Sequence, residues 1–225
     1  MYKTVALPLS YTPKRDPCSY RPFYCNSLQL SSSGKTAGVL LYWSDRLKNT
    51  MIIVFTGNGK GKTTASLGQM VRVAGRGKGA LMIQFIKGPW ISGEDEFAKK
   101  YGIPADIFEV RKMGLGFVGI LGDNLPIESH RAAARHALDA FIQEQLSGKW
   151  QLIVLDEVNV AVSLGLISED DVLSAIRDFP EDRLLILSGR GAPQAFIDRA
   201  DLATEMRELK HPFQSGKAGQ ALVEF

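Results

Sequence analysis

The sequence has little cysteine and no apolar run long enough to span a membrane. Its two cysteines, Cys18 and Cys25, lie near the N-terminus without a histidine close by, and their spacing does not suit a metal site. We expect both to be free thiols, and thiol chemistry is excluded for the rest of the chain. With an ordinary composition and no spanning run, the chain is expected to be soluble and without a membrane partner. We expect it in the cytoplasm.

An excess of charge of one sign is also missing from most of the chain. The sequence contains 27 Lys and Arg against 24 Asp and Glu, for a net charge of +3. Residues 1–50 hold seven of the basic residues and only two of the acidic ones, so residues 51–225 are nearly neutral. A neutral body lacks the basic surface that nucleic acid requires, and we expect no nucleic-acid partner.

Residues 1–50 lack the sustained periodicity of a folded unit. Four prolines and a serine-rich stretch at 31–33 interrupt them, and only 39–43 has a regular pattern. The serine-rich, acid-poor composition faintly resembles an organelle transit peptide. Met51, however, stands directly before the first expected strand, which suits a misassigned translation start. We expect residues 1–50 to be an unstructured or misassigned leader and residues 51–225 to form one domain.

From residue 51 onward, short apolar runs alternate with amphipathic segments. This alternation predicts an α/β fold in which a mostly parallel sheet is flanked by helices and binds ligands at the carboxyl ends of its strands. Strands are expected at 51–56, 80–86, 107–111, 151–155 and 183–187. Helices are expected at 63–74, at 94–101, from Pro126 to about residue 146, and after Ser168. The long helix is expected to bury Ala133, Ala137, Leu138, Phe141 and Ile142.

A glycine-rich segment between the first strand and the first helix has the form of a phosphate-binding P-loop. Thr56 replaces the first glycine of the general pattern. Backbone N–H groups and the helix N-terminus can cradle phosphates, Lys62 adds a positive charge, and the Thr63 hydroxyl can reach a magnesium ion. The alternative is an ordinary glycine-rich turn. The pattern favours a P-loop NTPase fold of the RecA-like type, with the nucleotide held by Gly57, Asn58, Gly59, Lys60, Gly61, Lys62, Thr63 and Thr64.

Two acidic residues, Asp156 and Glu157, follow the apolar run Leu152–Leu155. In P-loop proteins such an acid at a strand end holds magnesium directly or through water. Alone, the pair is more often a helix cap or part of a solvated loop, but a P-loop in the same chain favours a metal role. We therefore expect Thr63 and Asp156 to bind Mg2+ and Glu157 to line the nucleotide site.

Two basic residues also follow expected strands. Arg190 comes after the strand at 183–187 and Lys87 after that at 80–86, so both are expected on the rim that carries the phosphate loop. Either can clamp phosphate, and either can equally be an ordinary surface cation. His130 and His136 are six residues apart on the long helix and thus on different faces, which favours solvated histidines over a metal pair.

Five segments together resemble one family, the P-loop type of corrinoid adenosyltransferase. They read TGNGKGKTTASLG, IQFIKG, VLDEVN, SGRGAP and KHPFQSGKAGQ, and they occur in order across residues 51–225. The resemblance implies transfer of the 5′-deoxyadenosyl group of ATP to the Co(I) of a reduced corrinoid, with release of triphosphate, in adenosylcobalamin biosynthesis or salvage. It also implies an electron-donating reductase as partner and a homodimer. For such a reaction we expect Lys62 to have a catalytic role, since its charge should stabilise triphosphate as the leaving group.

The family's corrin-facing loop resembles residues 113–124. There an aromatic side chain helps displace the lower axial ligand of the cobalt, and Phe117 is the candidate for this catalytic role. Many members read Gly-Phe-Thr-Trp at this point, whereas this chain has Gly119 where the second aromatic would stand. Phe117 can instead be a loop residue that anchors in the core.

Two other functions fit the same motifs. A generic P-loop NTPase or kinase would release phosphate or ADP instead of triphosphate. A non-catalytic corrinoid-binding protein would keep the nucleotide loop without productive geometry, a possibility raised by Gly119. The products and the turnover distinguish the three.

Overall fold

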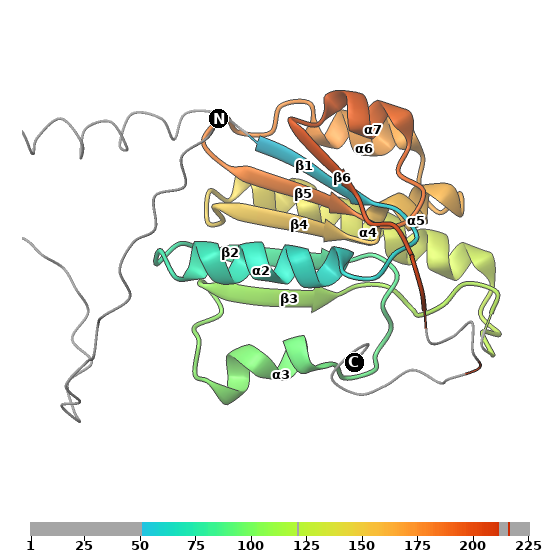
Figure 1. Cartoon of the computed structure of the whole chain (residues 1–225), viewed down its shortest axis with the longest axis horizontal. Coiled ribbons are helices and arrows are strands. Elements are labelled where there is room, and N and C mark those ends of the chain that lie inside the picture. Colours follow the sequence, from blue (N-terminus) through green and yellow to red (C-terminus); the bar gives the residue numbers. More distant parts are fainter. Residues whose placement is uncertain (1–50, 121, 212–215, 217–225) are drawn as a thin grey trace, which may run out of the picture. The chain divides into compact units, whose positions relative to one another are not determined.

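Six parallel strands form the central sheet, in the order β3-β2-β4-β5-β1-β6 (Figure 1). The structure is a computed structural model that describes residues 51–120, 122–211 and 216. The expectations for residues 1–50, and for most of the segment 210–220, lie outside the described residues. The strands are β1 (Met51–Thr56), β2 (Ala80–Gln84), β3 (Phe108–Lys112), β4 (Leu152–Asp156), β5 (Leu184–Ser188) and β6 (Leu202–Glu205). The predicted parallel α/β sheet is confirmed.

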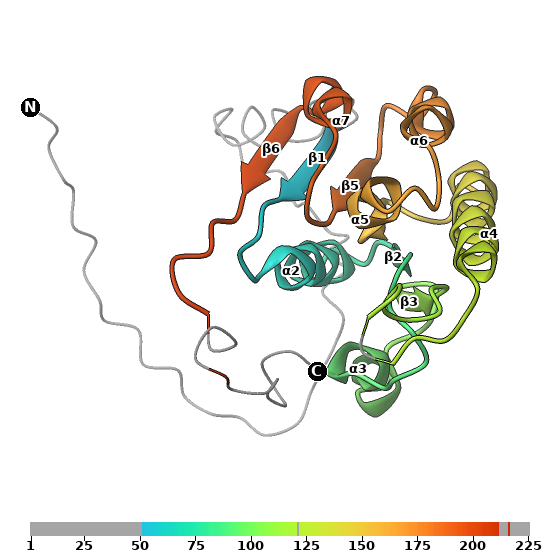
Figure 2. The ribbon, with the colours of Figure 1, turned by 90° about the vertical axis from the view of Figure 1, so that its right-hand side faces the viewer.

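Helices cover both faces of this sheet (Figure 2). One face carries α2 (Lys62–Ala74) and α3 (Gly93–Lys100). The opposite face carries α4 (Ile127–Leu146), α5 (Val158–Ser163), α6 (Glu169–Ile176) and α7 (Gln194–Arg199). Because the strands are parallel, their carboxyl ends all meet at one edge of the sheet, where the loops to the helices begin.

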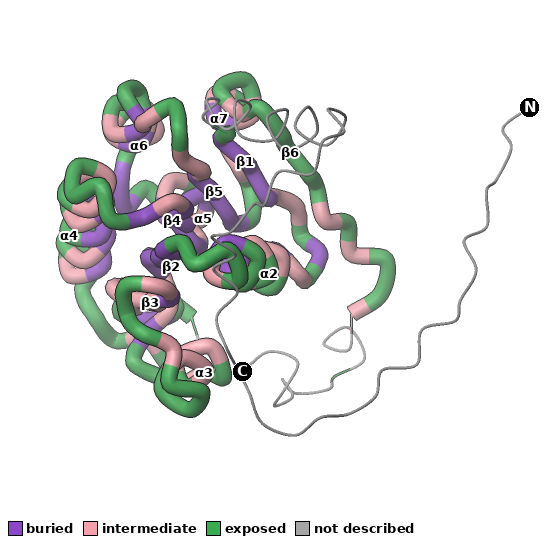
Figure 3. Tube along the Cα trace, turned by 90° about the vertical axis from the view of Figure 1, so that its left-hand side faces the viewer, coloured by how far each residue is buried: buried purple, intermediate pink, exposed green. Residues whose placement is uncertain are grey.

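The central strands are buried on both faces, which explains their unbroken apolar runs. In β4, Ile153 and Leu155 pack with α4 to α7, while Leu152 and Val154 pack with α2. Figure 3 shows buried residues along β1, β2, β4 and β5, whereas β6 at the sheet edge is exposed. The alternation of side chains along each strand thus divides one sheet between two hydrophobic clusters.

Local sequence signals account for the helix ends. In α6, the Ser168 hydroxyl accepts the Asp171 N–H at 3.0 Å and the Asp171 carboxylate accepts the Ser168 N–H, which forms a capping box. Pro126 is the N-cap residue of α4, so the helix begins one residue after the predicted start. The predicted buried face of α4 needs correction, because Ala133 and Ile142 are only partly buried whereas Ala134 is fully buried.

Three short elements were not expected from the sequence: α5, α7 and β6. Helices of six residues span fewer than two turns and leave no readable 3.6-residue period. The exposed strand β6 has no apolar run, since it pairs with β1 on one side only. The described residues also contain no helix long and apolar enough to cross a bilayer.

Candidate nucleotide-binding site

The P-loop connects β1 to α2 at the carboxyl edge of the sheet. Gly57 and Gly61 have positive φ angles of 92° and 118°, which side chains rarely adopt. A Cβ atom on Gly57 would lie 2.5 Å from the carbonyl oxygen of Met206, and one on Gly59 would lie 2.7 Å from the carbonyl carbon of Arg207. The Gly59 N–H donates to the Met206 carbonyl at 2.6 Å. The glycines are therefore required because the segment after β6 lies directly against the loop.

Lys62 extends into the loop and is only 6% exposed. Its Nζ donates to the carbonyl oxygens of Gly57 at 2.7 Å and Gly59 at 2.8 Å. Burial lowers the pKa of Lys62, Arg190 acts in the same direction, and Glu157 opposes both. A buried ammonium whose partners are neutral carbonyls is ready to exchange them for phosphate oxygens, because charge-assisted bonds are stronger.

Asp156 is the centre of a polar network that joins four elements. It is fully buried at the end of β4. Its Oδ1 accepts from the hydroxyl of Ser188 at 2.6 Å and from that of Thr63 at 3.0 Å. Its Oδ2 accepts from Gln84 Nε2 at 3.0 Å and lies 3.8 Å from Lys87 Nζ. These partners compensate the desolvation of the carboxylate and hold it beside the first turn of α2.

The oxygen atoms of Thr63 and Asp156 suit a magnesium ion but do not form a complete metal cage. Mg2+ commonly binds through one or two protein ligands, with phosphate oxygens and water completing its shell. Within the described residues, no cluster of three or more His, Cys, Asp or Glu side chains could hold a metal ion. The arrangement fits a metal ion that arrives with a triphosphate.

Glu157 is held in an unusual backbone conformation next to Asp156. Its φ of 61° is the one positive value among the non-glycine residues that the structure describes. Its N–H donates to Ser188 Oγ at 3.2 Å. Burial, reinforced by the charge of Asp156, raises the pKa of Glu157 to about 7. A non-glycine residue in the left-handed region costs about 1 kcal/mol, so the surrounding structure must stabilise this backbone conformation, which holds the carboxyl at the site.

The two rim cations lie in different surroundings. Lys87 forms an ion pair with Glu94 at 2.9 Å in addition to its contact with Asp156. Burial alone would lower the pKa of Lys87, but these two carboxylates raise it above its ordinary value. Arg190 follows β5, is exposed, and lies close enough to affect the pKa of both Lys62 and Glu157. The structure thus brings both cations to the edge where Lys62 lies.

The loop after β3 carries Phe117, whose side chain is 48% exposed. Its alternative role as a core anchor is not supported, because the neighbouring Val118 packs against the core instead. Asp123 orders the later part of the loop, since it accepts the N–H of Gly119 at 2.8 Å and lies 3.0 Å from His130 Nε2. The expectation that His130 is solvated is therefore wrong: it is 3% exposed and binds this aspartate.

His136 is exposed, as expected. Three polar residues of the site were not singled out from the sequence, namely Gln84, Ser188 and Asn159, and all three are fully buried. Asn159 Nδ2 donates to the carbonyl of Gly189 at 3.1 Å and so ties α5 to the loop after β5. For Gln84 and Ser188, the last residues of β2 and β5, a polar residue at the end of an apolar strand was the available signal, because such residues are buried only with partners.

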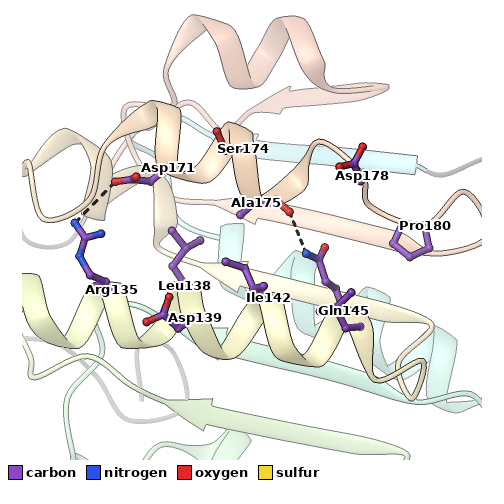
Figure 4. Close-up of a pocket in the computed structure, with 11 residues that line it drawn as sticks. Arg135, Leu138, Asp139, Ile142, Gln145, Asp171, Ser174, Ala175, Asp178 and Pro180 are labelled. Carbon is purple, nitrogen blue, oxygen red and sulfur yellow. Dashed lines mark hydrogen bonds and ion pairs between the residues drawn. The ribbon is translucent and has the colours of Figure 1, made fainter.

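A separate hollow of about 460 Å3 lies between α4 and α6 (Figure 4). Arg135 and Asp171 approach to 4.0 Å at one end, and Gln145 Nε2 donates to the Ala175 carbonyl at 3.1 Å further along. Its lining contains no residue of the P-loop or of the Asp156 network. The hollow is therefore a seam between two helices and not part of the nucleotide site.

A glycine loop closed around a buried lysine, with a hydroxyl and a carboxylate beside it at the carboxyl edge of a parallel sheet, defines a P-loop nucleotide-binding protein. The comparisons with known proteins define the family. Residues 48–225 match the model of the ATP:corrinoid adenosyltransferase family BtuR/CobO/CobP. The chain belongs to this family of enzymes, and the family prediction is confirmed.

Curated relatives can be aligned with this chain over most of their length. The corrinoid adenosyltransferase of Escherichia coli K12 is 33% identical over 175 residues, which cover 78% of this chain and 85% of the relative. The corrinoid adenosyltransferase CobA of Salmonella typhimurium has the same identity and coverage. That of Pseudomonas aeruginosa is 34% identical over 78% of this chain and 83% of its own. The Hef helicase domain of Pyrococcus furiosus covers 81% of this chain and 40% of its own, at 14% identity and a TM-score of 0.41, and has no bearing on function.

Proposed function

We propose that the site transfers the 5′-deoxyadenosyl group of ATP to the Co(I) centre of a reduced corrinoid and releases triphosphate. The observation that carries this proposal is the contact of the P-loop with Asp156 through Thr63, in a chain of the corrinoid adenosyltransferase family. The function belongs to adenosylcobalamin biosynthesis or salvage.

The reaction balances without a covalent intermediate on the protein. The electron pair of Co(I) attacks C5′ of ATP and forms the cobalt–carbon bond. The bond between C5′ and its oxygen breaks, and that electron pair leaves with the triphosphate. Cobalt becomes formally Co(III). The protein must therefore hold the triphosphate as a leaving group and orient C5′ toward the corrinoid.

The P-loop is suited to the first of these tasks. Gly57, Gly59 and Gly61 allow close approach of backbone N–H groups, and Asn58, Lys60 and Thr64 complete the loop around the phosphates. Lys62 supplies a buried positive charge that stabilises the charge developing on the triphosphate. Arg190 adds a second cation from the loop after β5. Glu157 lies close enough to Lys62 and Arg190 that both charges act to lower its pKa.

Thr63 and Asp156 are the residues that would hold Mg2+. When bound, this ion would neutralise phosphate charge. Lys87 keeps the buried carboxylate of Asp156 paired in its absence. Phe117 would face the corrinoid from the loop after β3 and favour loss of its lower axial ligand.

The proposal also includes a partner, an oligomeric state and a location. Because a Co(I) substrate needs an electron donor, we propose a reductase as partner. We further propose that the protein is a homodimer in the cytoplasm.

An anaerobic assay with the full chain, ATP, Mg2+ and cob(I)alamin tests the function. We expect a light-labile adenosylated corrinoid and an equal amount of triphosphate. Release of ADP or phosphate without change in the corrinoid would favour a generic NTPase or kinase. Binding of both substrates without turnover would favour a non-catalytic corrinoid-binding protein.

A further inference from the structure

Two aromatic side chains from different loops lie side by side beyond the carboxyl ends of β2 and β3. Trp90 follows β2 and Phe117 follows β3, and their ring centroids are 5.9 Å apart with an angle of 33° between the planes. Trp90 is 59% exposed and Phe117 is 48% exposed. Indole and phenyl rings dominate the energetics of cores and interfaces, so two exposed rings in contact indicate a surface that a ligand covers.

Glycines at the base of this pair make room for the indole ring. A Cβ atom on Gly88 would lie 2.9 Å from Trp90 Cζ3, and one on Gly116 would lie 2.8 Å from Trp90 Cη2. Gly116 also has a positive φ of 112°. The ring thus rests on two backbone segments, and any side chain at either glycine would displace it.

Backbone contacts connect the pair to the Asp156 network. The N–H groups of Met113 and Gly114 both donate to the Gln84 carbonyl, at 3.0 and 3.1 Å, and Gly116 donates to Ile86 at 2.9 Å. The side chain of Gln84 in turn contacts Asp156. The segment with Trp90 therefore extends from the end of β2, which supports the proposed metal ligand, and the loop with Phe117 is hydrogen-bonded to that same strand end.

The side chains of Lys112 and Asp95 also hold the Trp90 segment. Lys112 Nζ donates to the backbone carbonyl of Trp90 and to the carboxylate of Asp95. Asp95 belongs to the capping box that starts α3, where it also accepts the N–H of Ser92 at 2.7 Å. The indole ring is exposed although its backbone is well anchored, which is the arrangement of a preorganised binding residue.

We propose that Trp90 and Phe117 together form the aromatic surface on which the corrinoid macrocycle packs, with Trp90 as a direct substrate-binding residue. This inference rests on the proposed function. A corrinoid is a broad ring system with apolar edges, and two rings from two loops contact more of it than a single loop residue can. An aromatic beside Phe117 is thus present in this chain although position 119 is glycine.

The test is the kinetics of Trp90→Ala and Trp90→Phe in the full chain, with cob(I)alamin and ATP varied in turn. For Trp90→Ala we expect the KM for cob(I)alamin to rise about tenfold or more, as for loss of one aromatic stacking partner. The KM for ATP should stay the same, and Trp90→Phe should restore most of the corrinoid affinity. Tyr101→Ala is the matched control, because Tyr101 is also exposed and also packs on another ring, that of Phe97.

Thermal unfolding of each variant separates binding from folding. Should Trp90→Ala fold poorly, Trp90→Gln occupies part of the same space with a polar group and must show the same selective rise. An unchanged corrinoid KM, or an equal rise for both substrates, overturns the role of Trp90 while leaving the function intact. A wild-type protein that makes no adenosylated product at any corrinoid concentration overturns the proposed function itself, and this inference with it.

Discussion

The hydroxyl of Thr63 lies 3.0 Å from Oδ1 of Asp156 and joins the first turn of α2 to the end of β4. These residues are 93 positions apart. Asp156 ends β4, Thr63 lies in the helix that follows β1, and β5 lies between these two strands in the sheet. The hydroxyl and the carboxylate are the two protein groups that we propose as ligands of the magnesium ion, and they are already in contact. The fold alone thus places the two proposed metal ligands side by side.

Replacement of Thr63 tests this contact. Thr63→Val keeps the shape of the side chain but removes the hydroxyl, so we expect the Mg2+ concentration for half-maximal activity to rise about tenfold. Thr63→Ser keeps the hydroxyl and should behave like the wild type. The measurement is a Mg2+ titration of adenosyl transfer at saturating ATP. An identical Mg2+ requirement in the valine variant would show that Thr63 does not bind the ion.

Removal of the Lys62 charge tests the stabilisation of the leaving group. We expect Lys62→Ala to lower kcat by about 100-fold to 1000-fold. The buried positive charge of Lys62 stabilises the triphosphate most strongly in the transition state, where negative charge develops on it. Lys78→Ala removes an exposed lysine before β2, at the opposite edge of the sheet, and serves as control. Wild-type turnover in the Lys62 variant would refute the role.

The close approach of Gly59 to Arg207 predicts a loss of nucleotide binding in Gly59→Ala. The added methyl group would collide with backbone atoms, and backbone cannot move as a flexible side chain does. We expect weaker ATP binding by calorimetry and a lower melting temperature. Gly68→Ala in α2 is the control: a Cβ there meets nothing within 4 Å, so helix propensity should stabilise that variant by about 0.5–1 kcal/mol. Equal behaviour of the two variants would contradict the packing argument.

The pKa of Glu157 predicts how stability depends on pH without nucleotide and Mg2+. Its value of about 7 in the folded state lies above the ordinary 4.5, so the fold favours the neutral carboxyl. The stability gained from this neutral form is complete below the unfolded pKa and is lost as pH rises through about 7. Lys62, Lys87 and Arg190 face the carboxyl and oppose the shift without reversing it.

Glu157→Gln should therefore raise the melting temperature relative to the wild type more at pH 8 than at pH 5. An amide cannot ionise, so this variant avoids the cost of a buried charge at high pH. Glu181→Gln changes an exposed carboxylate and should show no such difference. A stabilisation independent of pH would mean that the carboxyl is not neutral in the fold.

The amino-acid sequence alone predicted the elements that have strong local signals. The P-loop was readable because the phosphate cradle uses consecutive residues, and β4 was readable because a strand buried on both faces is continuously apolar. The order of motifs likewise indicated the family. None of these features requires a contact between distant parts of the chain.

Tertiary structure decided what depends on distant contacts. His130 was expected to be solvated, yet it is buried. Its ring is paired there with Asp123 from the preceding loop. The pairing of Trp90 with Phe117 arises because β2 and β3 are neighbours in the sheet, a fact that no local pattern contains. The sequence thus determined which groups the site has, and the strand order determined which of them meet.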